Sequence, residues 1–441
     1  MIILRGITLL TLCLATLGLG AQTNIDFTKY TLDNGLKVIL HQDATAPIVT
    51  VSVMYEVGGK DSFEGRTGFA HFFEHLLFEG TENIPRGEFA KYVENAGGVL
   101  NANTTQDRTY YYEILPSNQL ELGLWLESER LLHAVVDQDG VETQREVVKE
   151  ERRNRMDNQP YGSFQYELFR HGFKKHPYKD PNIGYMADLN GAQEADYMRF
   201  YETYYVPNNA ILSIAGDIDL EEARKLVAKY FTDIPKGAEP PRITVVEPPL
   251  GGEVRDTVYD GKAPLPALIM GYRTPERSHP DYYAISMMNQ VLSQGQSSRL
   301  NKVLVDEKQL AVQAGSFPNT SQNPGLAIAF AIMKPGGDVK AAEMAFNAEV
   351  EKMQTDLISE REFQKLLNQV EAEAVTNYTS MARIAEGLAN YEMYQGDANL
   401  INTETERYRK VTREDIRRVA GKYFTLDNRV TLYWIPGQAS R

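Results

Sequence analysis

Residues 27–41 alternate apolar and polar side chains around Asp33-Asn34-Gly35, a pattern typical of a β-hairpin. Further β-rich runs predict strands at 48–57, 99–104, 109–115 and 210–215. Apolar residues that recur every three or four positions predict helices between these strands. The predicted helices cover residues 68–79, 86–96, 117–133, 137–158, 163–174, 192–204 and 219–231. We expect one domain of strands and helices over residues 23–234.

A similar order of elements follows a proline-rich segment. Residues 235–252 contain five prolines and end in Gly251-Gly252, which predicts a stiff linker. Beyond it, a strand at 266–272 precedes a helix at 281–294, and amphipathic helices are predicted at 339–355, 360–376, 380–394 and 412–423. Residues 253–441 would then be a second, similar domain. The predicted fold class is α+β, with two α/β sandwich-like domains of mostly antiparallel sheet covered by helices.

The overall composition is that of a globular protein that is too large for one ordinary core. The chain has 441 residues, 42% of them hydrophobic, and a net charge of −14. A strong negative charge disfavours nucleic acid and anionic membrane surfaces as partners.

Residues 1–22 differ from the rest of the chain. Arg5 is their only charged residue, and small residues follow the apolar run 7–19, which is typical of a secretory signal peptide. An uncleaved membrane anchor is the alternative, although the run is short for one. Cleavage would leave an exported protein, periplasmic or secreted in a bacterium, with no stable membrane insertion. The only cysteine, Cys13, lies in this segment, so the mature chain would form neither disulfides nor zinc–thiolate sites.

The segment His71-Phe-Phe-Glu-His75 carries the clearest chemical signal. On a helix, His71 and His75 share one face and Glu74 lies beside them. Imidazoles four residues apart can bind one divalent metal ion, and a neighbouring carboxylate can accept a proton from water. The alternative is a pair of ordinary core histidines. Burying two imidazoles and a carboxylate in one apolar turn costs several kcal/mol without such a purpose, so we favour a metal site.

A zinc site with catalytic function usually needs a third protein ligand. The helix 137–158 is rich in glutamates, and its helical phase separates two of them. Glu150 falls on a stripe of polar residues, whereas Glu151 shares its stripe with Gln144, Val147 and Val148. The inward-facing carboxylate is therefore predicted to be Glu151. A solvent-exposed glutamate on a charged helix is the alternative.

These residues resemble the pitrilysin (insulinase) family of zinc metallopeptidases, in which H-x-x-E-H is completed by a glutamate some 75 residues later. Here the spacing from His75 to Glu151 is 76 residues. Several other segments also resemble the family: Gly97–Thr104, Asp107–Tyr111, Arg145–Glu151 and Ser297–Leu300. The size is similar to that of the short two-domain members, such as mitochondrial processing peptidase subunits and their bacterial relatives.

The resemblance implies an endopeptidase in which His71, His75 and Glu151 bind one Zn²⁺ per chain and Glu74 is the general base. It also implies that Asn101-Ala102-Asn103 presents a sheet edge, to which a peptide substrate binds as an added β-strand. Two similar halves would close around small or unstructured polypeptides in a clam-shell arrangement. Aligning Ala70 with Ala284 indicates that the second half is a degenerate copy without metal ligands.

Two departures from the family pattern affect these expectations. Gln144 stands where many members have a glutamate that supports the metal ligands. Val305 and Val312 replace an arginine and a tyrosine that bind the substrate carbonyl in active members. We therefore expect a heterodimer with a homologous subunit that supplies this pair, or otherwise a homodimer. The alternative function is that of a non-catalytic structural or binding subunit, like the core proteins of respiratory complexes.

Overall fold

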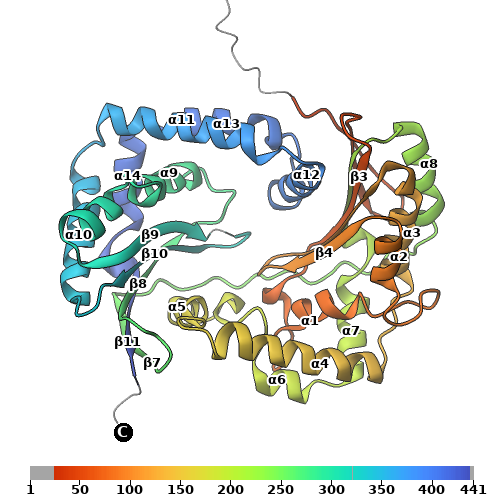
Figure 1. The fold of residues 1–441 in the computed structure, drawn as a ribbon, viewed down its shortest axis with the longest axis horizontal. Coiled ribbons are helices and arrows are strands. Elements are labelled where there is room, and N and C mark those ends of the chain that lie inside the picture. The colour runs from red at the N-terminus through yellow and green to blue at the C-terminus, as the bar shows by residue number, and fades with distance from the viewer. Residues whose placement is uncertain (1–23, 320, 438–441) are drawn as a thin grey trace, which may run out of the picture.

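The structure is a computed structural model that describes residues 24–319 and 321–437, so the predicted signal peptide at 1–22 lies outside it. Two β-sheets, each covered by helices, lie on opposite sides of the molecule (Figure 1). This arrangement confirms the predicted fold class of two similar sheet-and-helix halves. Within the described ranges, no helix combines the length and the apolar composition needed to cross a bilayer.

The first half of the chain forms a six-stranded sheet with the order β1-β2-β6-β3-β5-β4. Neighbouring strands pair antiparallel except β2 and β6, which pair parallel. β1 and β2 form the predicted hairpin, and β4 is an edge strand that pairs with β5 alone. The strands are β1 (Thr28–Thr31), β2 (Lys37–Gln42), β3 (Ile48–Tyr55), β4 (Val99–Thr104), β5 (Thr109–Pro116) and β6 (Ala210–Gly216).

The second sheet repeats this topology without a counterpart of β1. Its five strands have the order β7-β11-β8-β10-β9. β7 and β11 again pair parallel, at the position of β2 and β6, and the other neighbours pair antiparallel. The strands are β7 (Val254–Asp260), β8 (Ala267–Thr274), β9 (Ala311–Asn319), β10 (Gly325–Met333) and β11 (Arg429–Pro436). The sequence analysis predicted β8 but not the other four strands.

Most helices lie close to the predicted ranges, but the helical segments at Met186–Gly191, Asn301–Glu307 and Leu400–Arg409 were not predicted. Those of the first half are α1 (Phe69–Leu76), α2 (Phe89–Asn95), α3 (Leu120–Leu132), α4 (Gln138–Arg152), α5 (Phe164–Gly172), α6 (Met186–Gly191), α7 (Glu194–Tyr204) and α8 (Leu220–Phe231). Those of the second half are α9 (Tyr282–Ser293), the π-helical η6 (Asn301–Glu307), α10 (Val339–Thr355), α11 (Glu360–Asn377), α12 (Met381–Gln395), α13 (Leu400–Arg409) and α14 (Arg413–Tyr423). Residues 232–253, between α8 and β7, form neither helix nor strand.

One face of each sheet is covered by helices of its own half. In the first half, alternate residues such as Val51 and Val53 of β3 pack against α1, α3, α7 and α8. In the second half, Met270 of β8 packs in a core with α9, α10 and α14. α9 therefore occupies the position in the second half that α1 occupies in the first.

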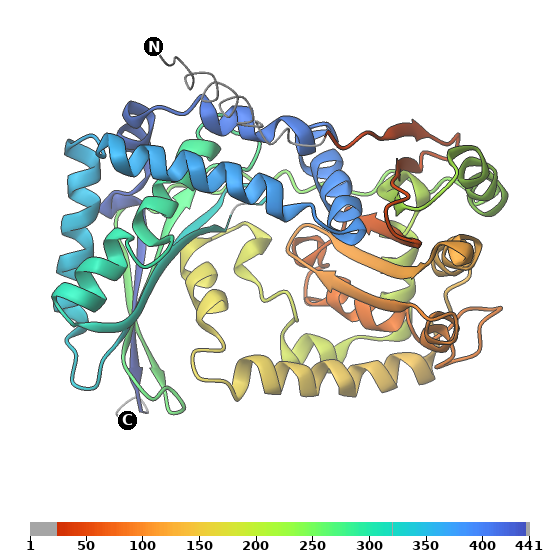
Figure 2. The same ribbon diagram turned by 45° about the horizontal axis from the view of Figure 1, so that its top comes forward.

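The opposite face of each sheet is covered by a helix from the other half. Leu168 of α5 packs on β8, in one cluster with Ile269. In return, Leu388 of α12 packs in a cluster with Ile39 of β2 and Met54 of β3. Figure 1 shows both exchanges, and Figures 1 and 2 show α11 and α13 running from the second sheet toward the first. The two halves are thus held together by reciprocal helix packing, in addition to the extended segment that joins them.

Candidate metal centre

The helix that carries the two histidines, α1, begins at a glycine in a tight turn. Gly68 has a φ of 85°, in the left-handed region that favours glycine. A Cβ atom there would lie 2.6 Å from the carbonyl oxygen of Ile183, so another backbone segment passes directly against this turn. Gly68 therefore fixes where α1 starts, three residues before His71.

Most of the surface of α1 is buried in the first core. All five of its apolar residues are at most 1% exposed, namely Phe69, Ala70, Phe72, Phe73 and Leu76. The ring of Phe69 stacks on Tyr197 of α7 with a centroid distance of 4.4 Å. This packing fixes the rotation of the helix, so that His71 and His75 face α4.

Helix α4 brings the third side chain to the same place. Asp137 caps its first turn by accepting a hydrogen bond from the Gly140 N–H at 2.7 Å. Val148 is fully buried on the inner face, and Glu151 follows it by three residues. Glu150 points outward instead, with a side chain that is 58% exposed and pairs with Arg153 at 2.9 Å. A π-helical turn, Arg153–Asp157, follows directly, a feature often found beside functional sites.

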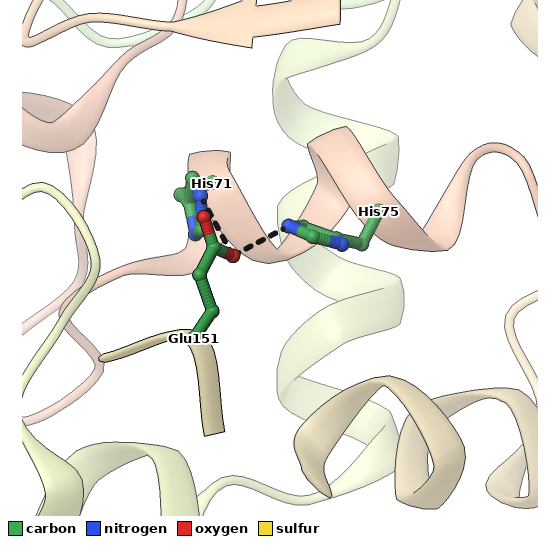
Figure 3. Close-up of side chains that lie close together, drawn as sticks. All are labelled: His71, His75 and Glu151. Carbon is green, nitrogen blue, oxygen red and sulfur yellow. Dashed lines mark ion pairs between the residues drawn. The ribbon is translucent and has the colours of Figure 1, made fainter. Parts of the chain in front are cut away.

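Three side chains converge at this point (Figure 3). Glu151 Oε2 lies 3.0 Å from His75 Nε2 and 3.5 Å from His71 Nε2, and the candidate ligand atoms all lie within 4.8 Å of one another. Tetrahedral ligands bound at about 2.1 Å from a zinc ion are separated by about 3.4 Å. The spacing of the three residues therefore fits one zinc ion.

The charge of Glu151 is balanced by its surroundings. Burial alone would raise the pKa of its carboxyl, but the adjacent imidazoles of His71 and His75 hold that pKa well below its ordinary value. Its other oxygen, Oε1, pairs with the exposed Arg155 at 2.6 Å. The carboxylate is therefore ionised, as a metal ligand must be.

The site also contains polar atoms that the described protein leaves without partners. Glu151 Oε2 and His71 Nδ1 are buried and form no hydrogen bond with any residue in 24–319 or 321–437. A buried carboxylate oxygen without a donor is costly unless it binds a cation. The His₂Glu donor set suits zinc, and the residues present therefore fit such an ion.

Glu74 lies on the same helix between the two histidines and is partly exposed. Its charge adds to the effect of burial in raising the pKa of the Tyr111 and Tyr205 hydroxyls. A carboxylate with this access to solvent, next to a metal ion, can accept a proton from water.

Gln144 contacts a different residue from the ligands that it was expected to support. Its Nε2 donates to Glu79 Oε1, and the other oxygen of Glu79 accepts from Arg86 Nε. Glu79 lies four residues after His75, just beyond α1. Its two oxygens accept hydrogen bonds from an amide and a guanidinium. The sequence analysis missed Glu79, although its i, i+4 spacing from His75 could have indicated it.

The strand that was expected to bind substrate, β4, has one open edge. Ala102 N–H donates to the side-chain Oδ1 of its neighbour Asn101 at 2.8 Å, and the carbonyl oxygen of Thr104 accepts from Asn182 at 2.9 Å. Because backbone groups alternate in direction along a strand, both contacts lie on the edge away from β5. Asn103 binds elsewhere, accepting from Arg108 Nη1 at 2.6 Å.

The second half has two apolar side chains and one amide at the positions that correspond to the metal motif. Ile285 and Met288 of α9 are fully buried, and Asn289 is 1% exposed and donates to the Ile285 carbonyl at 2.8 Å. Val305 of η6 packs partly against the second core, whereas Val312 of β9 is 53% exposed. Neither valine can donate a hydrogen bond to a substrate carbonyl.

Comparisons with known proteins agree with this geometry. Residues 37–184 match the model "Insulinase (Peptidase family M16)", and residues 193–370 match "Peptidase M16 inactive domain". The zinc protease PqqE of Helicobacter pylori is 31% identical over 438 residues, 98% of each chain. A probable mitochondrial-processing peptidase subunit beta of Schizosaccharomyces pombe is 24% identical over 407 residues, 89% of this chain and 87% of its own. The crystal structure of a protease from Helicobacter pylori superimposes with a TM-score of 0.89 and 30% identity, covering 93% of this chain and all of that one.

Proposed function

Since this chain belongs to the insulinase family of peptidases, peptidase family M16, we propose that it is a zinc-dependent endopeptidase with one Zn²⁺ per chain. The observation that carries this proposal is the convergence of His71, His75 and Glu151, with Glu74 on the same helix turn. The two histidines and Glu151 would hold the metal. When bound, zinc supplies Lewis-acid polarisation of the scissile carbonyl.

The roles of the protein groups follow from their positions. Glu74 accepts a proton from the attacking water and returns it to the leaving amine. The buried His71 and the more exposed His75 would both hold the metal, and the packing of α1 fixes their positions relative to each other. Arg155 neutralises the outer oxygen of Glu151 and keeps that carboxylate turned toward the histidines.

We also propose that substrates bind along the open edge of β4 as an added strand. The backbone groups of Leu100 and Ala102 would face this strand, since they alternate with those that pair with β5. The Asn101 side chain, which now holds the Ala102 N–H, would turn away when a peptide binds. Recognition through backbone groups suits small or unstructured polypeptides, because folded chains do not present a free strand.

A homologous partner subunit would complete the active site. The support for this proposal is the pair Val305 and Val312, together with the similarity to a relative that is named as a subunit. We further propose that residues 1–22 direct export, which would place the peptidase in the periplasm or outside the cell.

The test is the substitution Glu74→Gln, compared with Glu94→Gln on the exposed surface of α2. Zinc content and cleavage of an unstructured fluorogenic peptide are measured on the chain together with any subunit that co-purifies with it. We expect Glu74→Gln to retain zinc and lose at least about a hundredfold in kcat, and Glu94→Gln to match the wild type. Unchanged cleavage in Glu74→Gln, or a wild-type protein without zinc, would exclude this mechanism.

A second candidate function is that of a non-catalytic subunit that binds peptides or partners. It is favoured by the match of residues 193–370 to a domain described as inactive and by the two valines. In that case Glu74→Gln would leave every measurable property of the complex unchanged, including any peptidase activity contributed by the partner.

A further inference from the structure

A cluster of three ionisable side chains without any solvent exposure lies behind the metal-bearing helix. Arg130 and Glu127 come from α3 and Glu113 from β5, and the side chains of all three are 0% exposed. Buried charges of this kind are rare unless they are paired, and their desolvation costs several kcal/mol per ion. Replacing such a cluster with apolar residues is often neutral or stabilising, so stability alone explains it poorly.

The cluster contacts the end of α1 directly. Arg130 Nη1 donates to the carbonyl oxygen of Leu77, the C-cap residue of α1, at 2.8 Å. The guanidinium is stacked between the rings of Phe78, Phe89 and Tyr111, with centroid distances of 4.6, 4.4 and 4.3 Å. A cation at a helix C-terminus also interacts favourably with the helix dipole. Arg130 therefore restrains the backbone carbonyl of Leu77, two residues after His75.

A second group, on strand β5, holds the preceding turn of α1. Tyr111 Oη donates to the carbonyl oxygen of Phe73 at 2.8 Å. Phe73 and Leu77 lie on either side of Glu74 and His75. Two directional hydrogen bonds thus flank the residues whose placement determines the metal geometry, and both come from groups stacked on one another.

The charges within the cluster are unequally shared. Arg130 Nε contacts both oxygens of Glu127, at 3.1 and 3.2 Å, whereas Nη2 makes one longer contact of 3.3 Å with Glu113. Glu113 Oε2 is buried without a hydrogen-bond partner in the described part of the chain. Burial and the neighbouring Glu127 charge raise the pKa of Glu113 well above its ordinary value. Arg130 is therefore held mainly by Glu127, which it contacts through two oxygens, and only weakly by Glu113.

We propose that Arg130, with Glu127 as its counter-ion, is a positioning residue that sets the placement of His75 and Glu74 through the Leu77 carbonyl. This inference rests on the proposed metallopeptidase function. It gives a buried arginine on α3, outside the metal-binding motif, a role in positioning the motif residues. A one-ångström displacement of a metal ligand or base is enough to reduce activity by about a hundredfold, so a rigid anchor at this carbonyl has a measurable effect.

The test uses metal binding as a readout that is independent of peptide cleavage. The affinity for zinc and the visible absorption spectrum of the Co²⁺-loaded protein are measured for four variants. Arg130→Lys keeps the charge but lacks the fork that reaches Leu77 and Glu127 together. The double variant Arg130→Met with Glu127→Leu removes the charges and fills the volume, so that it folds even if single changes do not. Glu113→Gln keeps the size of the side chain that makes the longer contact with Arg130, and Val227→Ala creates a cavity beside α8, away from α1.

For Arg130→Lys and the double variant, we expect an altered cobalt spectrum and a zinc affinity weakened by about tenfold. Val227→Ala should lower the melting temperature without changing either readout, and Glu113→Gln should match the wild type. The inference is overturned if the folded double variant binds both metals as the wild type does. It is also overturned if Glu113→Gln changes the spectrum as much as Arg130→Lys, because Glu127 would then not be the sole counter-ion. A wild-type protein that binds neither metal would refute the proposed function itself.

Discussion

The backbone N–H of Gln322 donates to Asp107 Oδ2 at 2.9 Å, which joins the β9–β10 turn of the second half to the β4–β5 turn of the first. The other oxygen of Asp107 accepts from Lys60 Nζ at 2.9 Å and from Tyr178 Oη at 2.5 Å. Lys60 and Asp107 are 4% and 1% exposed. A single buried carboxylate therefore links three separate segments of the chain near the open end of β4.

Substituting Asp107→Asn should strongly destabilise the protein, because Lys60 would remain buried without its counter-charge. We expect a loss of about 3–5 kcal/mol in the free energy of unfolding, measured by urea denaturation at pH 6. Glu386→Gln is the control, since it alters the partly exposed ion pair with Arg108 and should cost about 1 kcal/mol or less. Equal stabilities of the two variants would contradict the role of Asp107 in joining the halves.

Asp61, next to Lys60, makes the stability of this region depend on pH. The side chain is 3% exposed, and burial raises its pKa from 3.8 to about 7, although Lys60 and a hydrogen bond from Gly58 oppose the shift. The folded state therefore binds this proton more tightly than the unfolded state, and the stability it contributes at low pH is lost as pH rises from about 4 to about 7.

The side chain of Asn does not ionise, so the stability of the variant Asp61→Asn relative to the wild type should increase with pH. Between pH 5 and pH 8 we expect the difference in unfolding free energy to shift by roughly 2–3 kcal/mol in favour of the variant. Urea denaturation at several pH values measures it. A difference that stays constant over this range would mean that Asp61 is already ionised at pH 5.

Helical phase was sufficient to distinguish Glu151 from Glu150, because both lie on one long helix whose apolar positions identify its inner face. We expect Glu151→Gln to lose bound zinc, with the affinity falling at least about a hundredfold, whereas Glu150→Gln should keep full zinc content. Metal analysis of dialysed protein provides the measurement. Retention of zinc by Glu151→Gln would assign the third ligand to another residue.

The local pattern could also locate β8, α9 and the hairpin, since each depends on residues close together in sequence. It could not reveal the exchange of α5 and α12. Leu168 and Leu388 mark apolar faces that need cover, but nothing near them in sequence specifies which sheet provides it. Such choices depend on contacts between residues more than a hundred positions apart.

Gln144 illustrates a similar limit within the site. Its helical phase predicts that it faces α1, as it does, but not which residue of α1 or its extension it meets. The partner is Glu79, whose position depends on how the chain turns after Leu76.

Strand β10 was missed for another reason. β10 is buried on both faces and lacks alternation, and a short apolar run cannot be distinguished from a buried helix by periodicity.

The proposal that Val305 and Val312 replace a carbonyl-binding pair can be tested by introducing an arginine and a tyrosine at these positions. Val305 and Val312 lie on neighbouring elements, because Leu310 N–H donates to the Leu304 carbonyl at 2.8 Å where η6 meets β9. Val312 is exposed, so a tyrosine there would not disturb the core, and Val305 lies at the edge of the second core.

We expect Val305→Arg with Val312→Tyr to raise the kcat/KM of the isolated chain for an unstructured peptide, by about a hundredfold if the two groups bind the developing oxyanion as donors in other peptidases do. The rise should exceed that of either single substitution, and adding Glu74→Gln should abolish it. Zinc content must stay constant across the series. If the double variant binds zinc, folds as the wild type does and gains no activity, then the valines are not what limits the isolated chain, and the expectation of a partner that supplies this pair fails with it.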